Sequence, residues 1–423
     1  MTQLAAQAPL SPPPASGSSR DTRRLLIVLG CWIFALAAII RMAWWAVPSG
    51  LADLAVYRSG ALAVLHGSAL YSMKTPQGLP FTYPPVSALL AAPLTLVPLR
   101  VAELAWTLMV YVPVAVAIWF GFRDLLQRAG PYRLALFAAL IGCCTFLVPV
   151  EQVMSFGQVD LFLVAVCLLD CCASRPRWPR GVLIGLAAAV KLEPAVFVVY
   201  LLITGRRKAA AVAAASFAAL SAAAWVVAPR DSLTYWGRAI FDTGRLGGNA
   251  AAGNQSLRGM LLRSFVPGHL VSMTWLIMAV IVAAAGFAAA RACWQYGDDR
   301  AGVAITGLLA ALLSPVGWIH HLCWVVVAIG VIVGSGRDWR RVAVAAAAFG
   351  LYLFRLPTWA QASGALQPEF VRRLLEDSFG LAALCLIGLI FAYSRQRYQR
   401  HDDQTAMAGA VPAGDVAVTR PSP

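Results

Sequence analysis

Residues 25–47, "LLIVLGCWIFALAAIIRMAWWAV", form an apolar run of 23 residues with one charge, Arg41. A helix of this length crosses the roughly 30 Å hydrocarbon core of a bilayer. Because lipid offers no hydrogen-bond partner to the backbone, a chain built from such segments folds as membrane-spanning helices. The run ends without a small-residue cleavage site, which favours a retained anchor over a removed signal peptide.

The composition supports the same class. Hydrophobic residues make up 60% of the 423 residues and charged ones only 13%, well below the roughly 25% charged residues of soluble domains. The formal charge of +15 comes from Lys and Arg in short loops between apolar segments, so membrane topology explains it and no nucleic acid is expected as a partner. None of the nine cysteines has C-x-x-C spacing, so we expect neither a metal site nor a disulfide framework.

We expect an all-α polytopic membrane protein with about twelve transmembrane helices. Segment 181–204 looks like one span, yet basic loops that belong in the cytoplasm flank it on both sides. The conflict is resolved if it forms two half-depth helices that meet at "KLEP", with Lys191 and Glu193 lining a cavity. The other ten helices are expected at residues 25–47, 101–121, 134–150, 159–173, 208–228, 269–290, 301–316, 321–335, 342–356 and 379–393.

The same charge rule assigns the loops and the ends of the chain. Segments 48–100, 229–268 and 357–378 are expected outside, and the short apolar stretch 85–98 should lie at the outer surface or re-enter. Residues 1–24 and 396–423 read as disordered cytoplasmic tails around one transmembrane domain at 25–395. We therefore expect a multi-pass protein of the cell membrane with both termini inside.

Asp53 follows the first apolar run directly, on a segment 52–66 that is expected to form an interfacial helix. Asp53 and Tyr57 are four residues apart and would share a face of that helix. A carboxylate held there could act as a general base. A first-turn Asp that is stabilised by the helix dipole is an equally good interpretation of the spacing alone.

Three further features carry polar groups into apolar surroundings. Lys191 should face a wet cavity or an anion such as a lipid phosphate, or else pair with Glu193. The adjacent His320 and His321 would point about 100° apart on a helix, so one is expected to face the cavity and the other to pack. Asn254 and Gln255, in "NQSLRG", could bind a polyol or cap the following helix. Arg41 and Glu103 read as ordinary interfacial charges.

Six motifs then carry a resemblance to a known family. "DLAVYRSGALAVLHGSALY", "LPFTYPPVSALLAAPL", "SFGQVD", "AAAVKLEPAVFVVYLL", "NQSL" and "SPVGWIHHLCW" occur in this order between about residues 25 and 395. They resemble the motifs of family 87 glycosyltransferases, polyprenol-phosphate-mannose-dependent mannosyltransferases of the GT-C superfamily. The chain is similar in particular to actinobacterial enzymes that add α-1,2-mannose to phosphatidylinositol mannosides or lipomannan. Asp160 and Glu193 depart from the family pattern and add negative charge.

The resemblance implies a GT-C fold whose active-site loop follows helix 1 outside the membrane. It implies that Asp53 is the catalytic base, that His320 or His321 lies in the active site, and that Lys191 contacts the donor phosphate. An arginine such as Arg245 or Arg258 would assist Lys191. Further substrate contacts are expected from Tyr57, Tyr83, Gln158, Asn254, Gln255 and Trp318.

The expected reaction transfers mannose with inversion from polyprenyl-phosphate-mannose to a mannosylated phospholipid or lipoglycan in the membrane, without a metal or another cofactor. Because the leaving phosphate departs as an anion, one carboxylate suffices and no general acid is needed. The alternatives are an arabinosyltransferase that uses polyprenyl-phosphate-arabinose, and a lipid or sugar transporter. A transporter would predict inverted repeats, and the sequence shows none.

Overall fold

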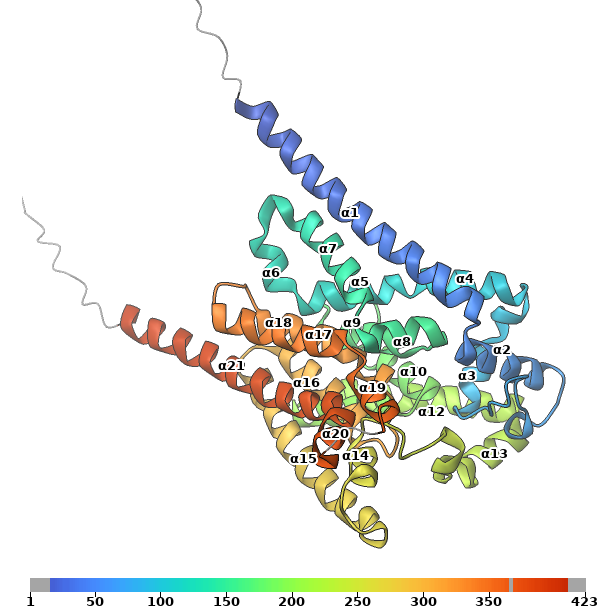
Figure 1. Cartoon of the computed structure of the whole chain (residues 1–423). Coiled ribbons are helices and arrows are strands. Elements are labelled where there is room, and N and C mark those ends of the chain that lie inside the picture. The colour runs from blue at the N-terminus through green and yellow to red at the C-terminus, as the bar shows by residue number, and fades with distance from the viewer. Residues whose placement is uncertain (1–15, 365–367, 410–423) are drawn as a thin grey trace, which may run out of the picture.

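The computed structural model of the chain describes residues 16–364 and 368–409. Within these ranges the regular elements are helices, accompanied by two isolated β-bridges, which confirms the all-α prediction (Figure 1). The α-helices are α1 (Ser16–Ser49), α2 (Ala52–Leu65), α3 (Pro85–Leu90), α4 (Leu99–Met109), α5 (Tyr111–Gly121), α6 (Arg123–Arg128), α7 (Arg133–Thr145), α8 (Val148–Phe156), α9 (Asp160–Cys172), α10 (Val182–Val190), α11 (Val196–Ile203), α12 (Arg207–Val227), α13 (Pro229–Gly237), α14 (Leu257–Arg263), α15 (Val271–Gln295), α16 (Asp299–Leu313), α17 (Val325–Val333), α18 (Trp339–Leu353), α19 (Leu356–Ala362), α20 (Glu369–Glu376) and α21 (Ser378–Gly409).

The number of candidate membrane spans is smaller than expected. In the described part of the chain, five helical stretches are long and apolar enough to cross a membrane, or up to seven if two bent pairs count as spans. The pairs are α7 with α8, bent by 73°, and α18 with α19, bent by 41°. Several of the other expected helices exist but are short: α9 has 13 residues, α16 has 15 and α17 has 9.

The short helices form the core, which explains why they can be short. All nine residues of α17 are buried, and α5, α16, α18 and α21 pack against this helix. In contrast, few apolar residues of α1, α12 and α15 are buried. Exposed apolar surface on long helices suits contact with lipid, whereas the central helices contact protein instead.

Helices α5 and α17 cross at unusually short range because glycines lie at the crossing. A Cβ atom added to Gly330 would lie 2.4 Å from the carbonyl carbon of Gly121, and one added to Gly121 would lie 3.0 Å from the Cα of Val327. Small residues of this kind let two helix backbones approach closely within a membrane.

Segment 181–204 is a broken helix, as the charge of its flanks predicted. Helix α10 ends at Val190, Lys191 has an extended backbone, and α11 begins at Val196 after a short 3₁₀ turn. Gly181, at the start of α10, lies against the carbonyl oxygen of Ala209, and α11 ends four residues before Arg207. Both outer ends of this α10–α11 hairpin therefore lie near the start of α12, with Lys191 at the opposite tip.

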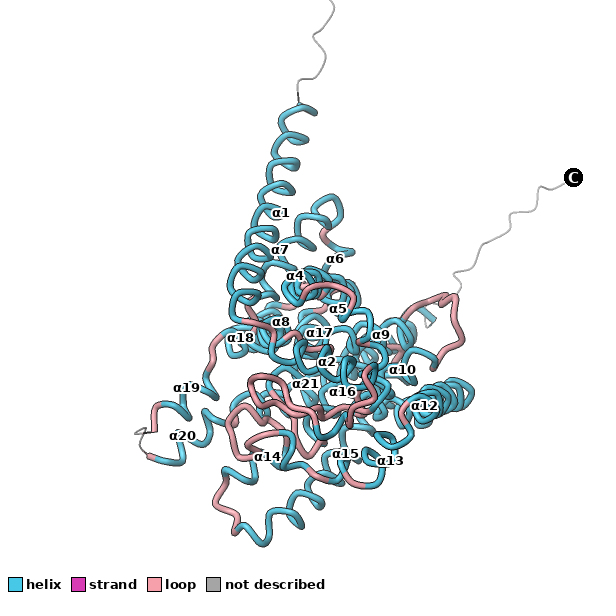
Figure 2. Tube along the Cα trace, turned by 90° about the vertical axis from the view of Figure 1, so that its right-hand side faces the viewer, coloured by secondary structure: helices cyan, strands magenta, loops and turns pink. Residues whose placement is uncertain are grey.

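The ends of the described chain project from one side of the molecule. Figure 1 shows the start of α1 and the end of α21 on the left, with α2, α3 and α13 on the right, and the rotated view in Figure 2 shows how far α1 extends beyond the helices that cover the core. Residues 16–24 and 396–409 belong to α1 and α21, so the helices are longer than expected. The predicted disordered tails otherwise lie outside the described residues.

Between α1 and α4 the chain forms short helices, as expected for a segment that is too polar to span. Helix α2 begins three residues after α1 ends, and α3 packs against α2, α10 and α12. A helix is therefore present where the sequence predicted an interfacial one. It packs on α3 and α8 and has Leu54, Val56 and Ala61 buried, whereas Leu65 is exposed.

Candidate active site

A cavity of about 680 Å³ lies where α2, the loop before α3, the hairpin tip and the segment 314–321 meet. These elements are far apart in the sequence, and the cavity gathers the chemistry-bearing residues of five of the six quoted motifs. The predicted site residues that line it are Asp53, Tyr83, Gln158, Lys191, Trp318, His320 and His321.

Asp53 lies in the first turn of α2 and faces this cavity. The turn that leads to it is held by Glu103, whose Oε1 accepts a hydrogen bond from the backbone N–H of Leu51 at 3.2 Å. Burial raises the pKa of Asp53 to about 6, although a hydrogen bond from Gln158 and the charge of Lys191 lower it. A carboxylate with a pKa close to neutral is well suited to accept a proton at physiological pH.

Gln158 connects the aromatic residues around Asp53. The Tyr57 hydroxyl donates to Gln158 Oε1 at 2.7 Å, and Gln158 Nε2 donates to the Tyr83 hydroxyl at 2.8 Å. Tyr83 lines the cavity, whereas Tyr57 is buried behind Gln158 and does not line it. Burial raises the pKa of both tyrosines, which therefore stay protonated. Tyr57 thus orients Gln158, and its expected role as a direct substrate contact has no support from this placement.

Lys191 lies at the hairpin tip within a cluster of ionisable groups. Its Nζ donates to Asp160 Oδ1 at 2.8 Å and lies 2.8 Å from His321 Nε2, while Glu193 Oε1 is 4.0 Å away. His321 Nδ1 is 2.9 Å from the same Glu193 oxygen. Asp160 and Glu193, which depart from the family pattern, are therefore the partners of Lys191 and His321.

Both histidines face the cavity, contrary to the expectation that one of them packs away from it. They belong to a tight 3₁₀ turn, Ile319–Trp324, and both line the cavity, with their ring centroids 4.6 Å apart. His320 is buried, and neither of its ring nitrogens has a hydrogen-bond partner among the described residues.

Possible ligand atoms of Asp160, His320 and His321 lie within 4.8 Å of one another. The Lys191 ammonium, bonded to two of these three residues, already supplies a cation at this place. The donor set does not fit a metal ion while that ammonium is present, since two cations would compete for the same oxygen and nitrogen atoms.

Asn254 and Gln255 do not line the cavity, and neither is the N-cap of α14, which is Ser256. Asn254 Oδ1 accepts hydrogen bonds from the N–H groups of Ser256 and Gly317 and from the Ser256 hydroxyl, which itself caps α14. Gln255 is bonded through its side chain to the backbone of Ala252, Glu376 and Gly380. The Asn254 amide thus holds Gly317, the residue before Trp318, whereas the Gln255 amide connects its segment to the start of α21.

Of the two arginines considered for a donor phosphate, Arg245 lines the cavity and Arg258 does not. Arg245 donates hydrogen bonds to the backbone carbonyls of Tyr71 and Phe81, which fix the loop ahead of Tyr83. Arg258 is 3.3 Å from the hydroxyl of Thr243, one layer behind the cavity wall.

Sequence reasoning underestimated two residues. Glu103 is almost fully buried and positions the turn before Asp53, although it reads as an interfacial charge. In the sequence, the one indication of this role is that Glu103 lies near the outer end of the expected helix 101–121. Asp160 was recognised only as a departure from a pattern, and its pairing with Lys191 depends on contacts between residues 31 positions apart.

Comparisons with known proteins identify the family of the chain. The model of glycosyltransferase family 87 matches residues 81–315. A polyprenol-phosphate-mannose-dependent α-(1-2)-phosphatidylinositol mannoside mannosyltransferase of Mycobacterium tuberculosis is 33% identical over 359 residues, which cover 81% of this chain and 83% of that protein. A phosphatidylinositol pentamannoside mannosyltransferase of the same species is 33% identical over 80% of this chain and 77% of its own length.

A further phosphatidylinositol mannoside mannosyltransferase, from Mycolicibacterium smegmatis, is 29% identical over 85% of this chain and 88% of its own. No solved structure matches the chain. The family model covers more than half of the chain, and the two relatives from M. tuberculosis align over most of its length. The chain therefore belongs to glycosyltransferase family 87 and is a glycosyltransferase.

Proposed function

We propose that the protein transfers mannose, with inversion, from a polyprenyl-phosphate-mannose donor to a phosphatidylinositol mannoside, and forms an α-(1,2) linkage. The observation that carries this proposal is that Asp53 and Lys191 face one cavity from two separate elements. A base and a phosphate-binding cation are the two groups that such a transfer requires. The two relatives from M. tuberculosis, named as α-(1-2)-mannosyltransferases of phosphatidylinositol mannosides, support mannose, the phospholipid acceptor and the linkage.

In the reaction, the Asp53 carboxylate accepts the proton of an acceptor hydroxyl as its oxygen attacks the anomeric carbon of the donor. The bond between that carbon and the phosphate oxygen breaks, and its electron pair leaves with the phosphate. Attack from the side opposite the phosphate converts a β-mannosyl donor into an α-mannoside. The proton ends on Asp53, and the phosphate gains one negative charge.

Lys191 and Arg245 would stabilise that charge. An ammonium has three N–H donors, and two of those on Lys191 have partners at hydrogen-bond distance among the described residues. The third is free to donate to a phosphate oxygen. Donors that are already oriented by Asp160 and His321 need little reorganisation when charge develops.

The indole of Trp318 and the ring of Tyr83 provide flat apolar surfaces of the kind on which sugar rings pack. A Cβ atom on Gly247 or Gly253 would lie 3.2 or 3.3 Å from the Trp318 ring, so both glycines leave room for the indole. We infer that Trp318 orients a mannose, and that His320, with its free ring nitrogens, hydrogen-bonds to sugar hydroxyls.

In the membrane, this function places the cavity on the extracytoplasmic face and both termini in the cytoplasm. The support is that the start of α1 and the end of α21 lie on one side of the molecule and the α2–α3 region on the other (Figure 1).

The test measures transfer of radiolabelled mannose from polyprenyl-phosphate-mannose to phosphatidylinositol mannosides of different length, with polyprenyl-phosphate-arabinose as a competing donor. Membranes carry the native chain or Asp53→Asn at equal protein levels. Loss of an α-(1,2) product in the variant supports the proposal. Equal transfer by both proteins would exclude Asp53 as the base, and transfer of arabinose alone would replace the mannose donor.

A further inference from the structure

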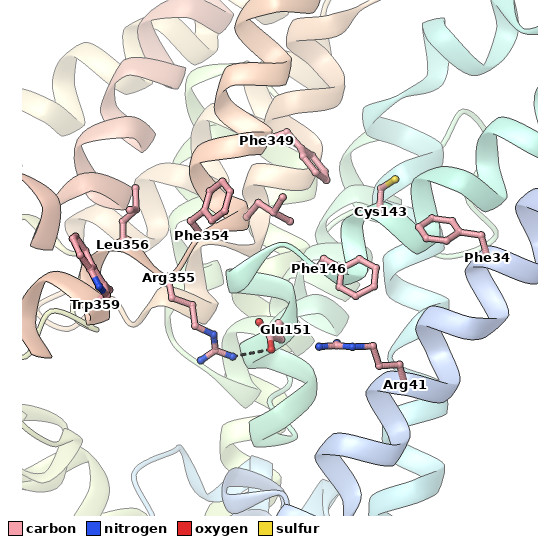
Figure 3. A pocket seen from close by; sticks show the side chains of 11 residues that line it. Phe34, Arg41, Cys143, Phe146, Glu151, Phe349, Phe354, Arg355, Leu356 and Trp359 are labelled. Atoms are coloured by element: carbon pink, nitrogen blue, oxygen red, sulfur yellow. Dashed lines mark hydrogen bonds and ion pairs between the residues drawn. The ribbon is translucent and has the colours of Figure 1, made fainter. Parts of the chain in front are cut away.

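A second and larger cavity, of about 870 Å³, lies between α1, α7, α8, α18 and α19 (Figure 3). Most of its lining is apolar and includes the aromatic rings of Phe34, Phe146, Phe349, Phe354 and Trp359. Three charged residues complete it: Arg41, Glu151 and Arg355. We call this cavity the lipid groove. None of these residues lines the catalytic cavity.

The polar groups of the lipid groove gather at one end. Arg41 follows Phe34 by seven residues on α1, which corresponds to about 10 Å along a helix, and Arg355 follows Phe349 by six. Figure 3 shows Arg41, Glu151 and Arg355 close together, with Phe349, Cys143 and Phe34 at the other end. Helix α1 continues from Arg41 towards α2, so the charged end is the end nearer to Asp53 along that helix. The apolar part of the lipid groove thus suits the acyl chain of a phospholipid, and its charged end suits the phosphate group.

The charged end of the lipid groove has two arginines, Arg41 and Arg355, but one carboxylate, Glu151. Arg355 donates a hydrogen bond to Glu151 Oε1 at 2.7 Å. Arg41 lies over the ring of Phe146 at 5.4 Å, but makes no hydrogen bond or ion pair within the described ranges 16–364 and 368–409. An arginine on a membrane-spanning helix is costly unless it meets water or an anion, and a phosphate between Arg41 and Arg355 would supply the anion.

We propose that the lipid groove binds the phosphodiester and one acyl chain of the phospholipid acceptor. This inference rests on the proposed function. The donor phosphate is bonded directly to the reacting carbon, so it has to lie beside Lys191 in the catalytic cavity. In the acceptor, inositol and mannose units separate the phosphate from the reacting hydroxyl. The acceptor phosphate therefore belongs at a distance from Asp53.

Helix α8 provides that distance, because it forms a wall of both cavities. Glu151 lines the lipid groove, while the next residue, Gln152, and Phe156 line the catalytic cavity. A lipid held on one side of this nine-residue helix can extend its sugar headgroup around the end of the helix into the other side.

The kinetic test compares two acceptors, a phosphatidylinositol mannoside and an alkyl mannoside without phosphate. Arg41→Gln and Arg355→Gln are each expected to raise KM for the phospholipid acceptor roughly tenfold, because charge-assisted hydrogen bonds are lost. KM for the alkyl mannoside and for the donor should not change. Arg291→Gln, which removes an exposed arginine from α15, is the matched control. Equal effects on both acceptors would overturn the proposal.

A binding test does not depend on activity. Native mass spectrometry of the purified full chain measures retention of phosphatidylinositol and of diacylglycerol, which lacks the phosphate. Cys143→Trp, which fills the groove without changing charge, and Arg41→Gln should both lower retention of phosphatidylinositol, and Arg291→Gln should not. Unchanged retention in the groove variants overturns the proposal. If retention falls as expected but the native chain transfers no mannose, the proposed function fails, and with it the assignment of this lipid as an acceptor.

Discussion

The raised pKa of Asp53 predicts how transfer depends on pH. With a pKa of about 6, the ratio of carboxylate to acid is about 10:1 at pH 7 and about 1:10 at pH 5, so kcat/KM should fall about tenfold between them. An Asp with its ordinary pKa of 3.8 would remain more than about 90% ionised at pH 5. The donor phosphodiester stays ionised throughout, so it adds no pH dependence in this range.

Gln158→Leu tests whether the fall in kcat/KM at acid pH, the acid limb of the pH profile, reflects protonation of Asp53. The hydrogen bond from Gln158 lowers the pKa of Asp53, so its loss should move the acid limb to higher pH. The assay is initial-rate transfer to an alkyl mannoside between pH 5 and 8, with rates normalised to folded protein. An acid limb below pH 5 in the native chain, or one that does not move in the variant, would refute the reasoning, since a histidine in the same cavity would not respond to this hydrogen bond.

The stability of the folded chain provides a control, because the contribution of Asp53 to it should fall as pH rises, whereas transfer should increase. Because the pKa of Asp53 is higher in the folded than in the unfolded chain, folding favours the protonated acid. Stability from this group is therefore complete below pH 3.8 and is lost as pH rises through about 6, by about 3 kcal/mol at pH 7. Asp53→Asn removes this cost, so the variant should lose transfer but unfold at a temperature no lower than that of the native chain.

Three other predictions follow from the packing and the charges. Lys191→Met should abolish transfer and also lower the free energy of unfolding by roughly 3–5 kcal/mol, since Asp160 loses its buried partner; adding Asp160→Asn should restore the thermal midpoint but not transfer. Arg245→Gln should lower kcat/KM about 10- to 100-fold, the cost of one missing charge-stabilising donor, whereas Arg258→Gln should change it less than about 3-fold, because only Arg245 lines the cavity. Gly330→Ala should cost about 1–3 kcal/mol, visible as a lower thermal midpoint, because its Cβ would meet the backbone of α5.

The sequence predicted best where one physical rule leaves few choices. Basic loops on both sides of segment 181–204 required a break within it, and the structure has that break at Lys191. The polar segment after the first span could not lie in lipid, and it forms the expected helix with Asp53 in its first turn.

The remaining features depend on contacts that no local pattern encodes. The amide of Asn254 can bind a sugar or the protein backbone, and the sequence does not show which. In the structure it accepts a hydrogen bond from the backbone N–H of Gly317, which is 63 positions away in the sequence. Arg245 and Arg258 belong to the same segment, 229–268, and no local pattern shows which of them lines the cavity. The count of twelve spans is not confirmed. Helices α16 and α17, for example, are enclosed by other helices and are too short to count as candidate spans.

The α10–α11 hairpin has a consequence for mapping this protein in its membrane. Since both of its outer ends lie near the start of α12, reporter domains fused after residue 175 and after residue 205 should report the same compartment. A hydropathy plot that counts the hairpin as one crossing would invert the assigned orientation of all later helices and of the turn Ile319–Trp324. Asp53 and the two histidines would then be assigned to opposite faces of the bilayer.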